Sequence, residues 1–372
     1  MTSSHENTGL TPGRATAAPV PRAGDVRDDR AVAIWLLVCG AMIFAMAVIG
    51  AITRLTESGL SIMEWAPLRG TLPPLSDDEW RRVFALYREI PEYREMNAGM
   101  TLGEFKTIFW WEYVHRLWGR LIGVVFAVPF VVFLVRGRIR RALMPHLVAM
   151  FVLGGLQGLL GWYMVASGFA DRTDVSQYRL VAHLSAAVLI YGYVLWVAFG
   201  LLAPMPEVSR DHGAGRLRGG LVLALALVAL TIVSGGFVAG LNAGFTYNTF
   251  PLMDGDLVPE GYADLWPWWL NLFENLAAVQ FNHRALAVIT LGVVAGLWLW
   301  ARRVGLARQA RSAVHVMFAM AALQVVLGVS TLLLVVPVWL GAAHQAGALL
   351  LLTATLWALH AVRPAEARRE VV

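Results

Sequence analysis

The sequence of 372 residues is poor in cysteine, in lysine and in charge of either sign. Its one cysteine, Cys39, cannot form an intramolecular disulfide, and a metal site built from several thiolates is excluded. Only 15% of the residues are charged, whereas 58% are apolar and the mean hydropathy is +0.60. This balance excludes a soluble globular protein of this length and indicates a polytopic membrane protein. The expected partner is therefore the lipid bilayer, and no nucleic acid is expected to bind.

Long apolar segments account for most of the chain. A helix needs about 20 mostly apolar residues to cross a bilayer. Residues 1–30 are polar and rich in Pro, Gly and Ala, which predicts a disordered tail and not a cleaved signal peptide. The rest predicts an all-α integral membrane protein with eight transmembrane helices, at 31–53, 113–135, 145–166, 179–202, 219–240, 278–301, 312–336 and 339–361, the last two joined by a tight turn near Pro337.

The distribution of arginine predicts the orientation of these helices. Basic residues flank the spans on the side of the N-terminus, and the positive-inside rule makes that side cytoplasmic. The loop 241–277 carries five acidic residues and no basic one, which suits the outer side. We therefore expect both termini in the cytoplasm. The basic residues are Arg136, Arg138, Arg140, Arg141, Arg210, Arg216, Arg218, Arg302, Arg303, Arg308, Arg311, Arg363, Arg368 and Arg369.

The long outer loop 54–112 contains two helix-start signals. Ser76 and Glu79 form a capping-box pattern, and the apolar residues that follow recur at helical spacing. This predicts a short amphipathic helix on the outer membrane surface. Thr101 and Glu104 repeat the signal just before the second span.

The two halves of the chain resemble each other. EYVHRLWGR (Glu112 to Arg120) is matched by QFNHRALA (Gln280 to Ala287), and LQxxxG occurs at 156–161 and again at 323–328. Each half has four spans, so both copies share one orientation and a pseudo-two-fold axis along the membrane normal is expected. The prediction is two four-helix bundles, 31–202 and 219–361, with a cytoplasmic linker 203–218 and a cytoplasmic tail 362–372.

Four histidines are predicted at similar depth near the outer face. His115, His183, His283 and His344 each fall within the first turn or two of a span that runs inward. Two histidines that face each other across a four-helix bundle can supply both axial ligands of a haem iron, so two bundles predict two tetrapyrrole sites. The neighbouring arginines, Arg116 and Arg284, either pair with haem propionates or reach the lipid headgroups.

One difference separates the two copies. Glu112 stands three residues before His115 and shares a helix face with it, whereas the second copy has Gln280 before His283. An amide cannot accept or donate a proton in catalysis. Any acid-base chemistry is therefore expected in the first bundle.

These motifs, together with TRLTESGLSIMEWAPLRGTLPP (Thr53 to Pro74) and GLNAGFTYNTFPLMDG (Gly240 to Gly255), resemble the haem A synthase family over residues 31–361. The resemblance is to the proteobacterial and mitochondrial branch, because the outer-loop cysteine pair of other bacterial members is absent. A mechanism that requires those cysteines is therefore not carried over.

The resemblance implies both an activity and its site residues. The C-terminal bundle would hold haem b between His283 and His344, and the N-terminal bundle would hold haem O between His115 and His183. Glu112 would be the essential glutamate, as a proton acceptor or as a stabiliser of positive charge at the methyl carbon. The C8 methyl of haem O would be hydroxylated twice and dehydrated to the formyl group of haem A, for cytochrome c oxidase.

Partners beyond these haems are expected from the same resemblance. Haem O synthase (protohaem farnesyltransferase) and cytochrome oxidase assembly factors are candidates for contact, a homo-oligomer is left open, and the residues do not indicate the electron donor. Two other functions are kept as alternatives. One is a di-haem b electron-transfer cytochrome. The other is a proton-coupled transporter, which the position of the histidines away from the membrane midplane disfavours.

Overall fold

The computed structural model describes residues 23–64, 69–169, 172–203 and 213–363. Residues 1–22, 204–212 and 364–372 of the predicted tails and linker lie outside the described residues. Residues 23–30 and 213–218 are helical, so the predicted tail and linker bounds are wrong there. The described residues form helices and no strand. Five short 3-10 helices occupy Arg69–Thr71, Arg141–Leu143, Ala166–Gly168, Ala243–Phe245 and Trp268–Leu272.

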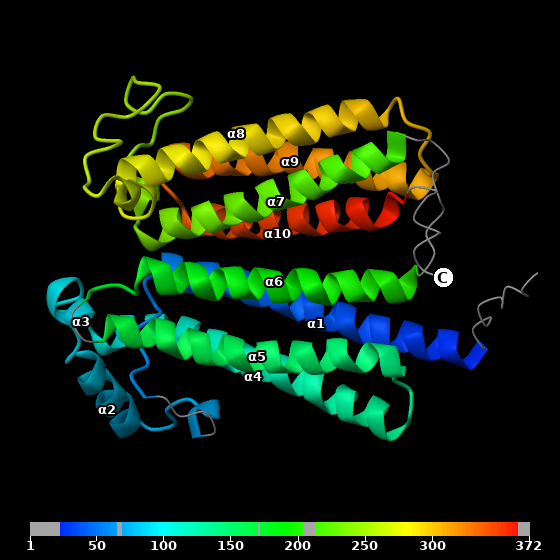
Figure 1. Ribbon diagram of the computed structural model, residues 1–372. Helices are drawn as coiled ribbons and strands as arrows, with labels where there is room; N and C mark the ends of the chain where they lie inside the picture. Colours follow the sequence, from blue (N-terminus) through cyan, green and yellow to red (C-terminus); the bar gives the residue numbers. More distant parts are fainter. Residues whose placement is uncertain (1–22, 65–68, 170–171, 204–212, 364–372) are drawn as a thin grey trace, which may run out of the picture.

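Eight of the α-helices are long and apolar enough to cross a membrane, which confirms the predicted number of spans. In Figure 1, α1, α4, α5 and α6 form one group, and α7, α8, α9 and α10 form a second group beside it. The helices are α1 (Ala23–Leu55), α4 (Leu102–Val135), α5 (Met144–Val165), α6 (Gln177–Leu202), α7 (Gly213–Gly240), α8 (Leu276–Ala301), α9 (Arg308–Leu333) and α10 (Val338–Ala361).

Helix α4 begins well before the predicted start at residue 113. Thr101 caps it with a complete capping box: its hydroxyl accepts from the amide of Glu104, and the Glu104 carboxylate accepts from the amide of Thr101 at 2.8 Å. The helix therefore projects beyond its apolar stretch. His115 lies roughly three to four turns from the helix start. The prediction that His115 lies within the first two turns of its helix is therefore wrong.

The connection between α9 and α10 is a tight turn, as predicted. Helix α9 ends at Leu333, three residues before the expected boundary, because Val335 and Val336 adopt left-handed conformations with φ of 60° and 53°. A β-branched residue rarely adopts this conformation. Pro337 then caps α10, which brings the two helices together as a hairpin.

The outer loop folds back onto the end of α4. Helix α2 (Asp77–Tyr87) has the predicted N-cap, Ser76, and α3 (Pro91–Glu95) follows it. Trp80 is buried with its ring 4.8 Å from that of Phe109 in α4, and Tyr87 is fully buried. The apolar face of α2 therefore packs on protein. The prediction that this face rests on the membrane surface is wrong. Figure 1 shows α2 and α3 at the same end of the molecule as the loop between α7 and α8.

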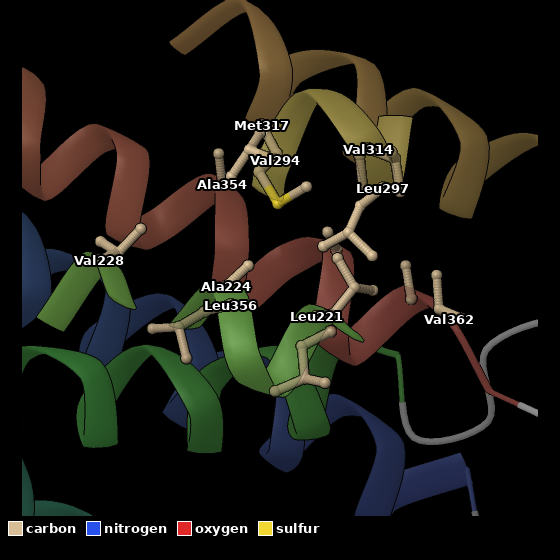
Figure 2. Packing of buried hydrophobic residues seen from close by; sticks show 14 of the residues in the cluster. Leu221, Ala224, Val228, Val294, Leu297, Val314, Met317, Ala354, Leu356 and Val362 are labelled. Atoms are coloured by element: carbon tan, nitrogen blue, oxygen red, sulfur yellow. The ribbon is translucent and has the colours of Figure 1, made fainter. Parts of the chain in front are cut away.

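A large cluster of buried apolar residues reaches the end of the second group opposite these outer loops. Figure 2 shows Leu221, Leu297, Val314 and Met317 converging from α7, α8 and α9, with residues of α10 beside them. Lipid tails are as apolar as leucine, so close van der Waals packing stabilises this contact more than exclusion from water does. The four histidines of the repeated motifs, His115, His183, His283 and His344, lie in the half of their helices nearer the outer loops.

Candidate functional site

Each of the four histidines packs its ring against a glycine of another helix in its own group. The pairs are His115 with Gly50, His183 with Gly161, His283 with Gly235, and His344 with Gly328. A Cβ atom at these glycines would lie 3.0, 2.9, 3.0 and 2.8 Å, in that order, from the Cε1 atom of the histidine. Any larger residue would displace the ring, so glycine is required to position each imidazole.

The second histidine pair has the spacing of two axial ligands. The ring centres of His283 and His344 are 6.4 Å apart and their planes make an angle of 87°. Two imidazoles on opposite sides of one metal ion, each bonded at about 2 Å, have ring centres about 6 Å apart. A porphyrin supplies the four remaining nitrogens itself. These two residues therefore fit a haem.

A glutamine contacts one histidine of each pair in the same way. The amide nitrogen of Gln157 lies 3.1 Å from Nδ1 of His183 and 2.9 Å from its carbonyl oxygen. Gln324 makes the same contacts to His344 at the same distances. An imidazole that binds iron through Nε2 carries its proton on Nδ1. The amide oxygens of both glutamines are buried without a partner among the described residues, and each can accept a hydrogen bond from Nδ1–H once the amide turns.

Glu112 is buried, 3% exposed, and both its oxygens are engaged. Oε1 accepts from Nε of Arg116 at 2.9 Å and also from Nη2 of the same residue. Oε2 accepts from the hydroxyl of Ser61 and the amide of Ile62, each at 2.7 Å. Arg116 also donates to the carbonyl of Ile62 at 2.7 Å. Four donors therefore hold the carboxylate in one orientation and stabilise its negative charge.

The second copy of the motif makes a different contact. Gln280 is 2% exposed, and its amide nitrogen donates to the carbonyl of Tyr247 at 3.1 Å. Arg284 donates to the same carbonyl at 2.7 Å and to that of Thr249 at 2.8 Å. In both copies the arginine therefore binds backbone carbonyls of the outer loop that precedes its helix. Propionate contacts of Arg116 and Arg284 stay predictions.

A further carboxyl group is buried in the outer loop near this site. Glu92 of α3 is 5% exposed, and its Oε2 has no hydrogen-bond partner among the residues that the structure describes. Burial raises its pKa to about 8, and the negative charges of Asp174, Glu112 and Glu57 act in the same direction. The carboxyl is therefore largely protonated at neutral pH.

The sequence interpretation missed several of these residues. Ser61 and Ile62 are 51 and 50 residues from Glu112, the carboxylate they bind, and the roles of Gly50 and Gly235 were not recognised. A position-by-position comparison of the two halves would have found the glycines, because each stands at the corresponding place in its own half. No local signal identifies Ser61.

Comparison with known proteins places these features in a family. The family model described as "Cytochrome oxidase assembly protein" matches residues 33–356. A Heme A synthase of Rhodospirillum centenum is 54% identical over 100% of this chain and 96% of its own length. Heme A synthases of Nitrosospira multiformis and Nitrosomonas eutropha are 52% and 50% identical, over 90% and 88% of this chain and 94% and 92% of their own lengths. The chain therefore belongs to this family of cytochrome oxidase assembly proteins, the one that its motifs resemble.

Proposed function

We propose that this protein is a haem A synthase that oxidises the C8 methyl group of haem O to the formyl group of haem A. Identity of about half to Heme A synthases over nearly the full chain supports the activity. The observation that carries the assignment of the reaction site is the buried Glu112, one helical turn from His115, where the other repeat has Gln280.

The two histidine pairs have different roles in this proposal. His283 and His344 hold haem b, which supplies electron transfer when bound. His115 and His183 hold the iron of the substrate, haem O. The fit of the His283–His344 spacing to one haem and the matching Gln157 and Gln324 contacts support two equivalent binding positions.

Glu112 acts on the methyl group that is oxidised. Two successive hydroxylations give a geminal diol, which loses water to form the aldehyde. The four donors hold the carboxylate in one orientation, and a carboxylate fixed in this way stabilises positive charge that develops at the methyl carbon. The same oxygens are candidate acceptors for the proton that is released.

The architecture in this proposal is two bundles, 31–202 and 219–361, related by a pseudo-two-fold axis. Equivalent histidine–glycine and histidine–glutamine contacts in the two groups of helices support it. Both termini face the cytoplasm of a bacterium and the protein lies in the inner membrane, as the arginine distribution suggests. Contact with haem O synthase or with oxidase assembly factors stays a prediction.

The test is extraction and chromatography of non-covalent haems from the purified wild type and from Glu112→Ala. The proposal expects haem b with haem O or haem A in the wild type. The variant should keep haem b and accumulate haem O or a hydroxylated intermediate without haem A. Haem b alone in both sites, unchanged by the substitution, would instead identify a di-haem electron-transfer cytochrome.

A further inference from the structure

His115 and His283 occupy equivalent positions in the two halves of the molecule. A Cβ atom at Gly50 or at Gly235 would lie 3.0 Å from Cε1 and 3.5 Å from Nδ1 of the histidine that it faces. The helix that carries the glycine therefore approaches both rings in the same way. The residue just before the glycine differs, however: it is Ile49 in α1 and Ser234 in α7.

The hydroxyl of Ser234 can fix which nitrogen of His283 carries the proton. The Ser234 oxygen donates its one hydrogen to the carbonyl of Thr231 at 2.8 Å, and it lies 2.8 Å from Nδ1 of His283. When its one hydrogen goes to this carbonyl, the oxygen accepts from the ring. In that arrangement the proton of His283 lies on Nδ1, and the lone pair of Nε2 is available to a metal ion.

His115 has no such partner. Its Nδ1 is buried and makes no hydrogen bond within the described parts of the chain. Ile49, at the position of Ser234, offers only an apolar side chain. The other histidine of each pair cannot account for a difference between the sites, because Gln157 and Gln324 make the same contacts at the same distances.

We propose that Ser234 is a positioning residue that makes the haem of the second bundle a permanent cofactor, and that Ile49 leaves His115 an exchangeable ligand. This inference rests on the proposed function, in which one haem stays while the other enters as substrate and leaves as product. A hydrogen bond to the outer nitrogen fixes the orientation of an imidazole and makes it a stronger ligand. The same fold thus provides one retaining site and one releasing site.

The test exchanges the two residues in the full-length protein. Ser234→Ala removes the hydroxyl, and Ser234→Thr is the conservative variant that keeps it. Ile49→Ser introduces a hydroxyl that can donate to the carbonyl of Met46, three residues earlier, as Ser234 does to Thr231. Ile49→Val is the matched control, since it changes size without polarity.

Two quantities are measured on each detergent-solubilised variant: the rate of haem transfer to excess apomyoglobin, and the reduction potential of haem b. Loss of such a partner costs about 10-fold to 100-fold in metal affinity. Ser234→Ala should therefore release haem b at least about 10-fold faster and raise its potential, because a weaker ligand stabilises ferric iron less. Ile49→Ser should slow release of haem O and haem A by a similar factor, and Ser234→Thr and Ile49→Val should behave as the wild type.

A release rate and a potential unchanged in Ser234→Ala would overturn the positioning role. So would equal changes in Ser234→Ala and Ser234→Thr, since these would indicate helix packing in place of the hydroxyl. Conversion of haem O to haem A by the same wild-type preparation is measured separately. Conversion with unchanged release in the variants refutes this inference alone, and retained haem b without conversion refutes the proposed function alone.

Discussion

At the scale of single residues, Glu112 depends on a side chain from a distant part of the chain. Ser61 donates to its Oε2 at 2.7 Å, and Thr246 occupies the corresponding position in the second half. A hydrogen bond to a charged group contributes about 1.5–3 kcal/mol. Ser61→Ala should therefore slow conversion of haem O by roughly 10-fold or more, with haem b content unchanged.

Thr246→Ala is the matched control for this change, because Gln280 does not require a charge-stabilising donor. The measurement is the initial rate of haem A formation, with haem b quantified in the same samples. Equal rates in Ser61→Ala and the wild type would show that the orientation of Glu112 does not limit the reaction.

Glycine supplies a second prediction at this scale. A Cβ at Gly161 would lie 2.9 Å from Cε1 of His183, whereas a Cβ at Gly158, one turn earlier on α5, meets nothing within 4 Å. Gly161→Ala should displace the ring and remove haem O and haem A from the purified protein while haem b is kept. Gly158→Ala should retain all of them, as chromatography of extracted haems will show. Loss of haem b in Gly161→Ala would contradict the assignment of His183 to the substrate.

At the scale of elements, the outer loop should respond to pH through α3. The pKa of Glu92 is raised to about 8 from an unfolded value of 4.5, chiefly by burial. A carboxyl whose folded pKa is raised contributes its full stability below the unfolded pKa. The loop should therefore lose stability as the pH rises from 4.5 to about 8. Other charged groups that act on Glu92 are the carboxylates of Asp174, Glu112 and Glu57 and the guanidinium of Arg54.

Limited proteolysis between α2 and α4 tests this expectation. Cleavage should be faster at about pH 8.5 than at about pH 5.5 in the wild type. Glu92→Gln stays neutral at both values and should remove the difference, whereas Glu89→Gln, at an exposed position, should keep it. A wild-type loop cut at the same rate at both values would show that Glu92 is not buried in its neutral form.

At the scale of the whole molecule, Arg54 joins the two groups of helices at their outer end. Its guanidinium pairs with Asp174 at 2.6 Å, on the segment between α5 and α6. It also donates to the carbonyl of Ala239 at 3.0 Å and to the amide oxygen of Asn242 at 2.9 Å, both beside the end of α7. Arg54 is largely buried, with 13% of its side chain exposed. The two groups therefore meet at a polar contact near the ends of α1 and α7 as well as along their helices.

Arg54→Ala should lower the free energy of unfolding by about 2 kcal/mol, because several charge-assisted hydrogen bonds are lost, the strongest of them to Asp174, whose side chain is 34% exposed. Arg82→Ala is the control: its pair with Glu64 is about half exposed and should contribute less than about 1 kcal/mol. The measurement is the thermal midpoint in detergent, with conversion of haem O followed in parallel. Unchanged midpoints in both variants would show that this contact does not stabilise the assembly of the two groups.

The sequence alone determined the features that depend on hydropathy, short spacing and repetition. The eight apolar stretches of spanning length form eight helices. In a bilayer the backbone polar groups of a single span can find hydrogen-bond partners only within a helix. Ser76 and the Thr101–Glu104 box correctly marked helix starts, since a cap is a contact between residues three apart. The repeated motifs identified four histidines as candidate haem ligands, and they identified the family.

Only the tertiary structure decided which groups meet across large distances in the chain. Ser61 reaches Glu112, Ser234 reaches His283, and Arg54 reaches Asp174, over separations of 51, 49 and 120 residues. Such pairs leave no periodic signal, because they result from how helices and loops pack and not from local conformation. For the same reason the apolar face of α2 was assigned to lipid from its pattern, and packing placed it on α4. The sequence pattern shows that a helix face is apolar, and the tertiary structure determines whether protein or lipid packs against that face.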